Sequence, residues 1–208
     1  MLDFLVFDNF YPNPDEIRTQ ALSLDYYNKK ESKTYKKNDA PWPGRVSKNQ
    51  FTVKGIDKIF GNLLQLDVRL VGSESNFFRY ITKNDEIDAK LKACHVDCIP
   101  EINQLYSAVI YLNKDTECID QNGNALKGTK FFRHKQTGQT KINSNKDYMM
   151  YLADFADPNK WMTDVTVYLK YNRCVLFNAS LFHNYGDFFG DSIENARLTH
   201  IYSLQQIK

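Results

Sequence analysis

From about residue 67 onward, the chain is a succession of short segments rich in β-branched and aromatic residues, many of which alternate with polar residues. Alternation with a period of two places successive side chains on opposite faces of an extended strand. Segments of this kind occupy residues 77–81, a stretch near 91–97, and residues 107–113, 129–134, 165–170, 174–178 and 197–204. Turns and polar stretches separate them. The pattern therefore predicts a sheet protein made of many short strands.

The N-terminal third has a different character. Residues 3–10 predict an edge strand. Asn13 is followed by proline and two acidic residues, which is typical of a helix start, so we expect a helix over 14–25. A second helix is expected over 55–66. Residues 26–50 between them are rich in lysine and broken by Pro-Trp-Pro-Gly, which predicts a long loop or flap.

Two helices ahead of a run of strands indicate a mainly β fold with flanking helices. The expected architecture is a double-stranded β-helix, the jelly-roll or cupin type of barrel, supported by the N-terminal helices. We expect residues 1–208 to form a single domain, with residues 1–74 as helical support and flap and residues 75–208 as the barrel core. Residues 135–163 look like an insertion in that core, helical around 147–156.

Composition narrows the class of partner. Aromatic residues make up 14% of the chain, which favours pleated, half-buried surfaces. The net charge is +2, from 27 basic and 25 acidic residues, and gives no indication of a nucleic-acid or membrane partner. The N-terminus lacks the basic region of a signal peptide, so a cytoplasmic location is expected. The four cysteines show no CxxC spacing, so neither a disulfide framework nor a zinc ribbon is indicated. The oligomeric state stays open.

Two of the four histidines, His95 and His183, lie at positions in the sequence where they could bind a metal. His95 and Asp97 are two residues apart, so on a strand they share a face. His183 follows the apolar strand at 174–178 and can return beside them. Two imidazoles and one carboxylate form a facial triad, which leaves open positions on Fe(II). No thiolate is in the set to favour zinc.

The other two histidines are alternatives for the third ligand. His134 ends the segment at 129–134 and is followed by a lysine, which predicts a solvated residue at a strand end. By alternation, His200 lies on the face of the last strand opposite to Arg197, which predicts a core position. Both interpretations favour His183 as the third ligand.

An anchor for an anion is expected on the last strand. Arg197 and Thr199 share one face, where a guanidinium group and a hydroxyl group can clamp a carboxylate. Burying such an arginine without an anion is costly, so an acidic ligand is implied. If the apolar residues of 107–113 pack beneath the helices, Tyr111 points inward and could bond the same carboxylate.

Several motifs together resemble a known family. The chain carries, in order, RYITKND, His95-Val96-Asp97, SAVIYLN, GTKF and the stretch KYNRCVLFNASLFHNYG…RLT, over roughly residues 75–204. These resemble the prolyl-4-hydroxylase-like branch of the 2-oxoglutarate/Fe(II) oxygenases.

The resemblance implies a set of ligands. Fe(II) would be bound by His95, Asp97 and His183, with 2-oxoglutarate and O2 as cosubstrates. Arg197 would bind the distal carboxylate of 2-oxoglutarate, assisted by Thr199 and Tyr111, and Tyr80 would face the same cosubstrate. The chain departs from the family in a longer gap between His183 and Arg197 and in the 135–163 insertion.

The resemblance also implies an activity. A carboxylate at Asp97 favours hydroxylation, because halogenases of this type carry a small residue there. The substrate would be a peptide, a protein or an amino-acid-like small molecule. Nucleic-acid repair enzymes of the family carry a second arginine where this chain has Ser203. Trp42 and Arg45, in the flap, are candidate substrate contacts. The alternatives are a non-catalytic metal-binding jelly-roll module and a zinc hydrolase, for which no general base is evident.

Overall fold

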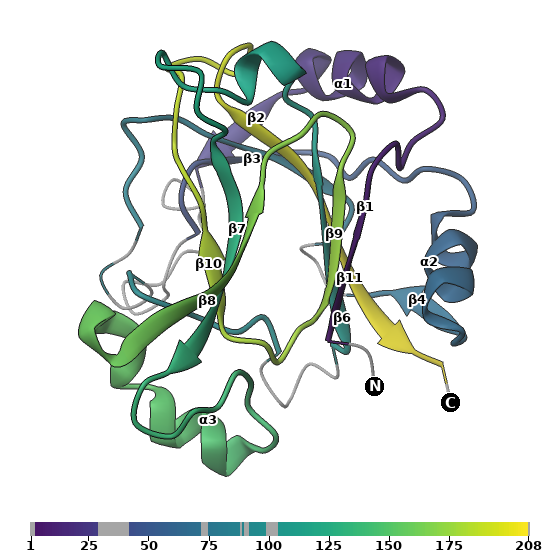
Figure 1. Ribbon diagram of the computed structural model, residues 1–208. Coiled ribbons are helices and arrows are strands. Elements are labelled where there is room, and N and C mark those ends of the chain that lie inside the picture. The colour runs from purple at the N-terminus through teal and green to yellow at the C-terminus, as the bar shows by residue number, and fades with distance from the viewer. Residues whose placement is uncertain are drawn as a thin grey trace.

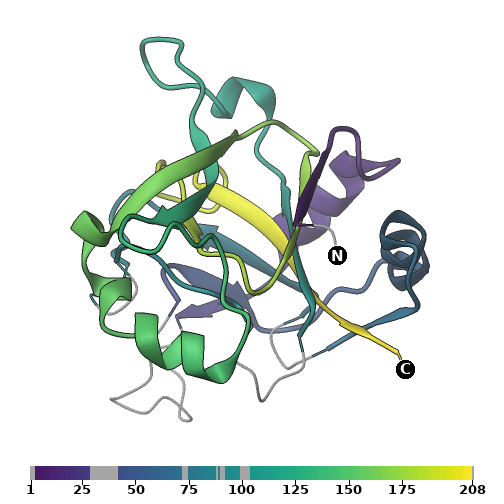
Figure 2. The same ribbon diagram turned by 60° about the horizontal axis from the view of Figure 1, so that its bottom comes forward.

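The computed structural model describes residues 3–28, 42–71, 75–87, 89, 92–98 and 104–207. Two antiparallel sheets face each other, and two helices cover the outer side of the larger sheet (Figures 1 and 2). This confirms the prediction of a mainly β fold with flanking helices. Within the described ranges, no helix is long and apolar enough to cross a membrane.

The larger sheet has the strand order β1-β9-β6-β11-β5-β3-β2, and β4 pairs with the end of β11. Its strands are β1 Phe4–Phe7, β2 Tyr26–Asn28, β3 Arg45–Ser47, β4 Val68–Leu70, β5 Phe77–Ile81, β6 Tyr106–Tyr111, β9 Cys174–Asn178 and β11 Arg197–Gln206. The smaller sheet has the order β10-β7-β8, from β7 Lys127–His134, β8 Trp161–Tyr168 and β10 His183–Tyr185. An antiparallel bridge from His95 to His183 extends the smaller sheet beyond β10.

The central strand β11 pairs with β5 along one edge and with β6 along the other. Its alternating side chains divide the interior into two cores. Leu198, Tyr202 and Leu204 pack outward, against Phe60 of α2 (Ile56–Leu64) and Ala21 of α1 (Pro14–Ser23). Arg197 and Thr199 project to the other face, toward the space between the sheets.

The core between the sheets joins residues of both. Tyr111 and Phe177 from the larger sheet pack with Phe131 and Val167 from the smaller one. The apolar residues of β6, Ala108 and Ile110, lie in the outer core under the helices, so the expectation that Tyr111 points inward is confirmed.

The 135–163 insertion forms a third core. It contains α3 (Asn145–Tyr151) and the 3-10 turns η4 (Asp154–Ala156) and η5 (Pro158–Lys160). A further 3-10 turn, η3 (Asp115–Glu117), lies between β6 and β7. Phe155 and Trp161 of the insertion pack on Cys94 and Phe182, the residues just before His95 and His183. The Phe155 carbonyl also accepts hydrogen bonds from the Ala93 and Cys94 N–H groups. The insertion therefore supports the backbone beneath both histidines.

The structure corrects the two ends of the expected flap, while residues 29–41 of this segment lie outside the described ranges. Its two ends are strands, because β2 pairs with β3 and β3 pairs with β5, and so they extend the larger sheet. The stretch near 91–97 contributes one bridge at His95 instead of a strand in its described part. His134 is not solvated: Trp161 and Tyr151 cover it, and its Nε2 lies 3.2 Å from Asp154 Oδ2.

Candidate metal centre

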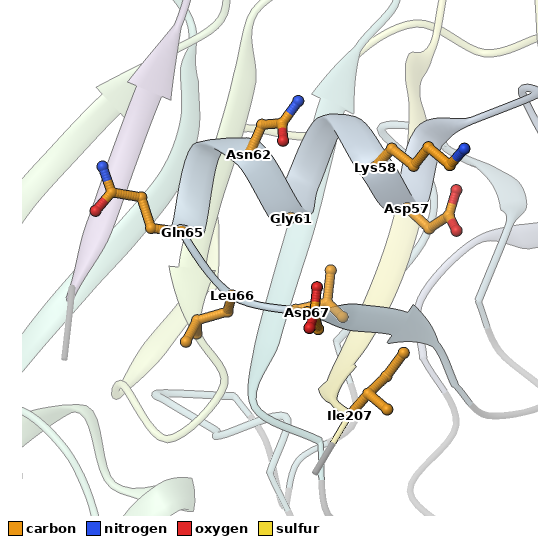
Figure 3. Close-up of a pocket in the computed structure, with 9 residues that line it drawn as sticks. Asp57, Lys58, Gly61, Asn62, Gln65, Leu66, Asp67 and Ile207 are labelled. Carbon is orange, nitrogen blue, oxygen red and sulfur yellow. The ribbon is translucent and has the colours of Figure 1, made fainter.

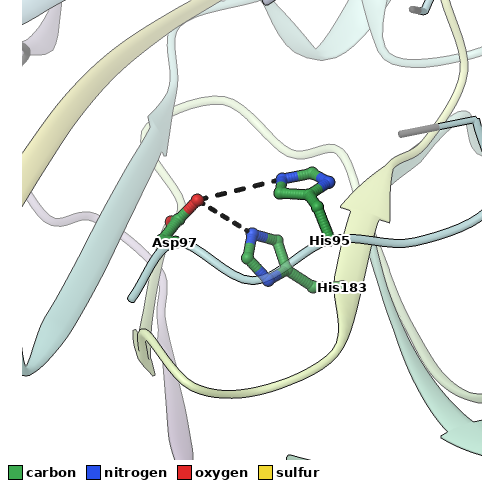
Figure 4. Close-up of side chains that lie close together, drawn as sticks. All are labelled: His95, Asp97 and His183. Atoms are coloured by element: carbon green, nitrogen blue, oxygen red, sulfur yellow. Dashed lines mark ion pairs between the residues drawn. The ribbon is translucent and has the colours of Figure 1, made fainter. Parts of the chain in front are cut away.

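His95, Asp97 and His183 converge between the two sheets (Figure 4). Asp97 Oδ1 lies 3.8 Å from His95 Nε2 and 3.4 Å from His183 Nε2. One potential ligand atom from each of the three lies within 4.8 Å of the others. Among the described residues, these three form the one group of histidine, cysteine or acidic side chains that lie close enough together to bind the same metal ion.

The backbone fixes this arrangement. His95 and His183 form an antiparallel pair in which each N–H donates to the carbonyl of the other, at 3.0 and 2.9 Å. Alternation from His95 then turns Asp97 to the same side and sends Cys94 and Val96 into the core of the insertion. Cys94 is therefore kept out of the ligand set by its position directly before His95.

The orientation of the His183 ring is compatible with a cation at this point. Its Nδ1 lies 2.8 Å from the Leu181 carbonyl, which can accept but not donate, so Nδ1 carries a proton. This bond turns Nε2 toward Asp97 Oδ1, which lies 3.4 Å away. An ion between these two atoms would be bound by both.

Burial sets the charge states of the other two ligands. Burial, together with the neighbouring His183 ring, lowers the pKa of His95 to about 3, so the His95 ring is neutral near pH 7. Burial alone would raise the pKa of Asp97. The two imidazoles and a hydrogen bond from Ser107 outweigh that effect, and the pKa falls well below its usual range. A neutral imidazole and an ionised carboxylate are the forms that bind metals.

Asp97 is held by residues that the sequence analysis did not assign. Ser107 Oγ donates to Asp97 Oδ2 at 2.5 Å and accepts from Gln104 Nε2 at 2.8 Å. These bonds occupy one carboxylate oxygen and leave the other for the histidines. Ser107 lies on the inward face of β6, as Tyr111 does, and this shared face was the available signal.

Arg197 lies on the same inner face and is 2% exposed. Its Nε and Nη1 are buried and have no hydrogen-bond partner. Its guanidinium carbon lies 5.3 Å from the centre of the Tyr111 ring. The Tyr111 hydroxyl is 2.7 Å from Thr129 Oγ1, and Gly128 leaves the room that this hydroxyl needs. Thr199 pairs with Tyr111 across the strands, and its hydroxyl donates to the Arg79 carbonyl at 3.3 Å.

The structure places Tyr80 differently from the expectation. Tyr80 pairs with Leu198 and packs against the outer core, on the face of the sheet away from Arg197. Its neighbour Arg79, which pairs with Thr199, takes the inward position instead. Arg79 is 8% exposed, and its Nη1 lies 3.3 Å from the Tyr185 hydroxyl. Tyr80 is therefore a packing residue, and sequence reasoning missed Arg79.

Trp42 and Arg45, the two candidate substrate contacts of the flap, lie in different surroundings. The Trp42 ring lies 5.1 Å from the His95 ring and 5.4 Å from the Arg79 guanidinium carbon, so it borders the metal centre. Arg45 lies over Tyr80, with its Nη1 3.9 Å from Asp85, and in this position it contacts the side of the sheet that Tyr80 occupies. Gly44 lies between Trp42 and Arg45 in the chain and has a positive φ. It packs so closely against the Tyr80 backbone that a larger residue would not fit.

Away from this site, a pocket lies on the outside of the molecule, between α2 and β4 (Figure 3). Its volume is about 660 Å³, and it is lined by residues that include Asp57, Lys58, Asn62 and Gln65. Its lining residues include none of those around His95 and Asp97, and no group of metal-ligating side chains among the described residues lies there.

Comparisons with known proteins give one family and two structures of similar shape. The model of a family described as "Family of unknown function (DUF6445)" matches residues 2–199. No curated protein matches the chain. A prolyl-4-hydroxylase from Pseudomonas putida aligns with a TM-score of 0.49 at 12% identity, over 99% of this chain and 94% of that one. HygX from Streptomyces hygroscopicus, with nickel and 2-oxoglutarate bound, aligns with a TM-score of 0.42 at 13% identity, over 98% of this chain and 83% of that one.

Proposed function

We infer that this chain, which belongs to the DUF6445 family, is an Fe(II)- and 2-oxoglutarate-dependent oxygenase that hydroxylates a C–H bond. The observation that carries this inference is that two groups, one from each sheet, face the same space between the sheets. The first is the cluster of His95, Asp97 and His183. The second is the buried guanidinium of Arg197, which has unpartnered N–H groups and no carboxylate within ion-pair distance among the described residues.

The donor set fits Fe(II). Two imidazoles and one carboxylate leave open coordination positions, and such a facial triad is typical of non-haem iron oxygenases. Ser107 and the Leu181 carbonyl orient the carboxylate and one ring, as outer partners of metal ligands commonly do. When bound, Fe(II) with 2-oxoglutarate and O2 would supply the oxidation of the substrate, with release of succinate and CO2.

Arg197 would hold the distal carboxylate of 2-oxoglutarate. A guanidinium fork matches a carboxylate in a bidentate manner, and a bound anion would relieve the cost of burying the unpaired charge. The hydroxyls of Tyr111 and Thr129 are joined at 2.7 Å beside it, and whichever of them accepts in that bond keeps its own proton to donate to the ligand. Thr199 would position the strand through its bond to the Arg79 carbonyl rather than through the ligand.

The topology agrees with a double-stranded β-helix, which we propose as the finer description of the fold. β5, β11, β6 and β9 would form one half of the barrel. The His95 segment, β10, β7 and β8 would form the other half. The metal ligands then come from neighbouring strands of the second half, and Arg197 comes from the facing half.

The test is stabilisation and turnover under defined ligands. Anaerobic Fe(II) with 2-oxoglutarate should raise the unfolding midpoint, and a ligand at about 100 times its dissociation constant adds about 2.7 kcal/mol. In air, the loaded protein should release succinate slowly even without substrate. His183→Ala should lose both effects. The matched control is His134→Asn, which removes an equally buried histidine outside the cluster and should keep both effects.

Other outcomes would select the alternatives. Stabilisation by metal that 2-oxoglutarate does not increase, with no succinate, would indicate a non-catalytic metal-binding module or a zinc hydrolase. An absence of stabilisation by either ligand would contradict the oxygenase assignment. The substrate class proposed at this stage is a peptide or a small amino-acid-like molecule.

A further inference from the structure

A second buried arginine on the inner face has no role in the function proposed above. Arg79 is 8% exposed, and its Nε is buried without a hydrogen-bond partner. Its bond to the Tyr185 hydroxyl, at 3.3 Å, is long and has an uncharged acceptor. No carboxylate lies within ion-pair distance of it among the described residues. Asp85, which follows β5, is instead held by the N–H and hydroxyl of Thr82.

Arg79 lies on the metal side of the inner face. Trp42 covers its guanidinium and also meets the edge of the His95 ring. The Tyr185 ring lies 5.6 Å from the His95 ring, and its hydroxyl contacts Arg79. The charge of Arg79 acts on His95 and lowers its pKa. Arg197, in contrast, lies beside Tyr111, whose hydroxyl is bonded to Thr129. The two arginines therefore lie at different parts of the inner face.

The chemistry of these groups specifies a ligand. A guanidinium group with a free Nε edge and an indole over its face recognises a planar anion in a bidentate manner. The two carboxylates of 2-oxoglutarate would be taken by the metal and by Arg197. A divalent ion, that dianion, Asp97 and two guanidinium groups leave one positive charge in excess, which one further carboxylate would cancel.

We propose that Arg79, under Trp42, is a substrate-binding residue that receives the α-carboxylate of a free amino acid or of a peptide C-terminus beside the metal. This rests on the oxygenase function proposed above. It also makes Trp42 a reporter, because its ring touches both the guanidinium and a metal ligand. The bound carboxylate would hold the substrate with its remaining atoms toward the open positions of the ion.

The experiment uses Zn(II) as an inert metal and measures tryptophan emission. The zinc-loaded protein, with and without 2-oxoglutarate, is titrated with the twenty L-amino acids, with their carboxamides, and with tripeptides whose C-termini are free or amidated. At least one acid should bind 10-fold or more tighter than its amide. Arg79→Gln should reduce that ratio to below threefold. Trp42→Phe identifies the part of the signal that comes from Trp42, since Trp161 is the second tryptophan.

The variants separate this inference from the function beneath it. Arg197→Gln should lose binding of 2-oxoglutarate, whereas Arg79→Gln should change that affinity less than threefold. Equal loss in both variants would overturn the inference, because Arg79 would then bind the cosubstrate. Amides that bind as tightly as acids, or acids that do not bind, would also overturn it. If wild-type protein failed to bind 2-oxoglutarate, the oxygenase proposal would fail, and the acid–amide ratio with zinc alone would still decide the role of Arg79. Free amino acids and peptide C-termini are told apart by which arm binds.

Discussion

Two buried histidines, His200 on β11 of the larger sheet and His183 on β10 of the smaller sheet, use their ring nitrogens in different ways. On the outer face, His200 Nε2 donates to the Phe51 carbonyl at 3.1 Å, so its Nδ1 accepts from the Tyr11 hydroxyl at 2.8 Å. Both of its nitrogens are satisfied by protein. Between the sheets, His183 donates through Nδ1 to Leu181 and turns its Nε2 toward Asp97 Oδ1, 3.4 Å away.

The same contrast holds for the faces as a whole. The outer face of β11 carries Leu198, Tyr202 and Leu204, packed under two helices, with a closed hydrogen-bond network. The inner face carries Arg197, whose Nε and Nη1 are buried without a hydrogen-bond partner. Buried polar groups are normally paired, and exceptions call for an explanation. The difference teaches that one face is complete as a protein core, whereas the other keeps buried donors that a ligand could satisfy.

The largest expected effect compares two neighbours on β5. Phe78 is fully buried in the outer core, where its ring lies 4.2 Å from that of His200. Phe78→Ala should lower the free energy of unfolding by about 3–5 kcal/mol, because it leaves a cavity. Arg79→Met, on the inner face, should leave the stability of the ligand-free protein unchanged or raise it. Urea unfolding of both variants measures this, and a large loss in Arg79→Met would remove the contrast.

The second effect concerns Arg197. Arg197→Met should raise the free energy of unfolding of the ligand-free protein by about 1–3 kcal/mol, since an uncompensated buried charge is replaced by an apolar side chain. The same variant should lose the roughly 2.7 kcal/mol of stabilisation from saturating 2-oxoglutarate. Arg197→Lys is the control that keeps the charge without the fork, and it should bind 2-oxoglutarate weakly. Denaturation with and without 2-oxoglutarate checks both signs, and destabilisation of the ligand-free Arg197→Met protein would contradict the interpretation.

The third effect is a pH dependence that belongs to the outer face. Burial lowers the pKa of His200 from its usual 6.5 to about 3. The contribution to stability is therefore fully present above about pH 6.5 and is lost as the pH falls toward 3, because the unfolded chain binds the proton first. Between pH 7.5 and pH 5, this amounts to about 2 kcal/mol. His200→Gln should be less stable than wild type at pH 7.5 and should lose less on acidification. An equal loss in the two proteins would mean that His200 is not held neutral.

The sequence predicted the fold well where a segment is long enough to show its period. The strands at 77–81 and 174–178 were predicted to the residue, and the edge strand and both N-terminal helices were found within a few residues. Strands of three residues, such as β2, β3, β4 and β10, show hardly one period, and tertiary pairing alone defines them. The packing of residues 135–163 beneath His95 was not predicted, because packing between distant segments leaves no local pattern.

In the candidate site, too, the sequence predicted what a local pattern shows and missed what depends on contacts between distant segments. The shared side of His95 and Asp97 and the inward position of Tyr111 followed from alternation, and His183 followed from its place after the strand at 174–178. Tyr80 was assigned to the cosubstrate from the family resemblance alone, and alternation along β5 instead turns Arg79 inward. Ser107 was missed because serine is common in strands and its partner Asp97 lies on another segment.

The smallest expected effect tests whether the inner face is built for the metal ligands. Ser107→Ala removes the hydrogen bond to Asp97 Oδ2 and leaves the triad itself intact. Metal affinity should fall about tenfold, or about 1.4 kcal/mol, because the carboxylate is then free to rotate. Ser203, which pairs directly with Ser107 on β11, provides the matched control, and Ser203→Ala should bind metal like wild type. Titration of the ligand-free protein with Zn(II) in competition with a chelator measures both affinities. If the two variants bound equally tightly, Ser107 would be an ordinary polar residue of the core, and the contrast between the faces would rest on the ligands and Arg197 alone.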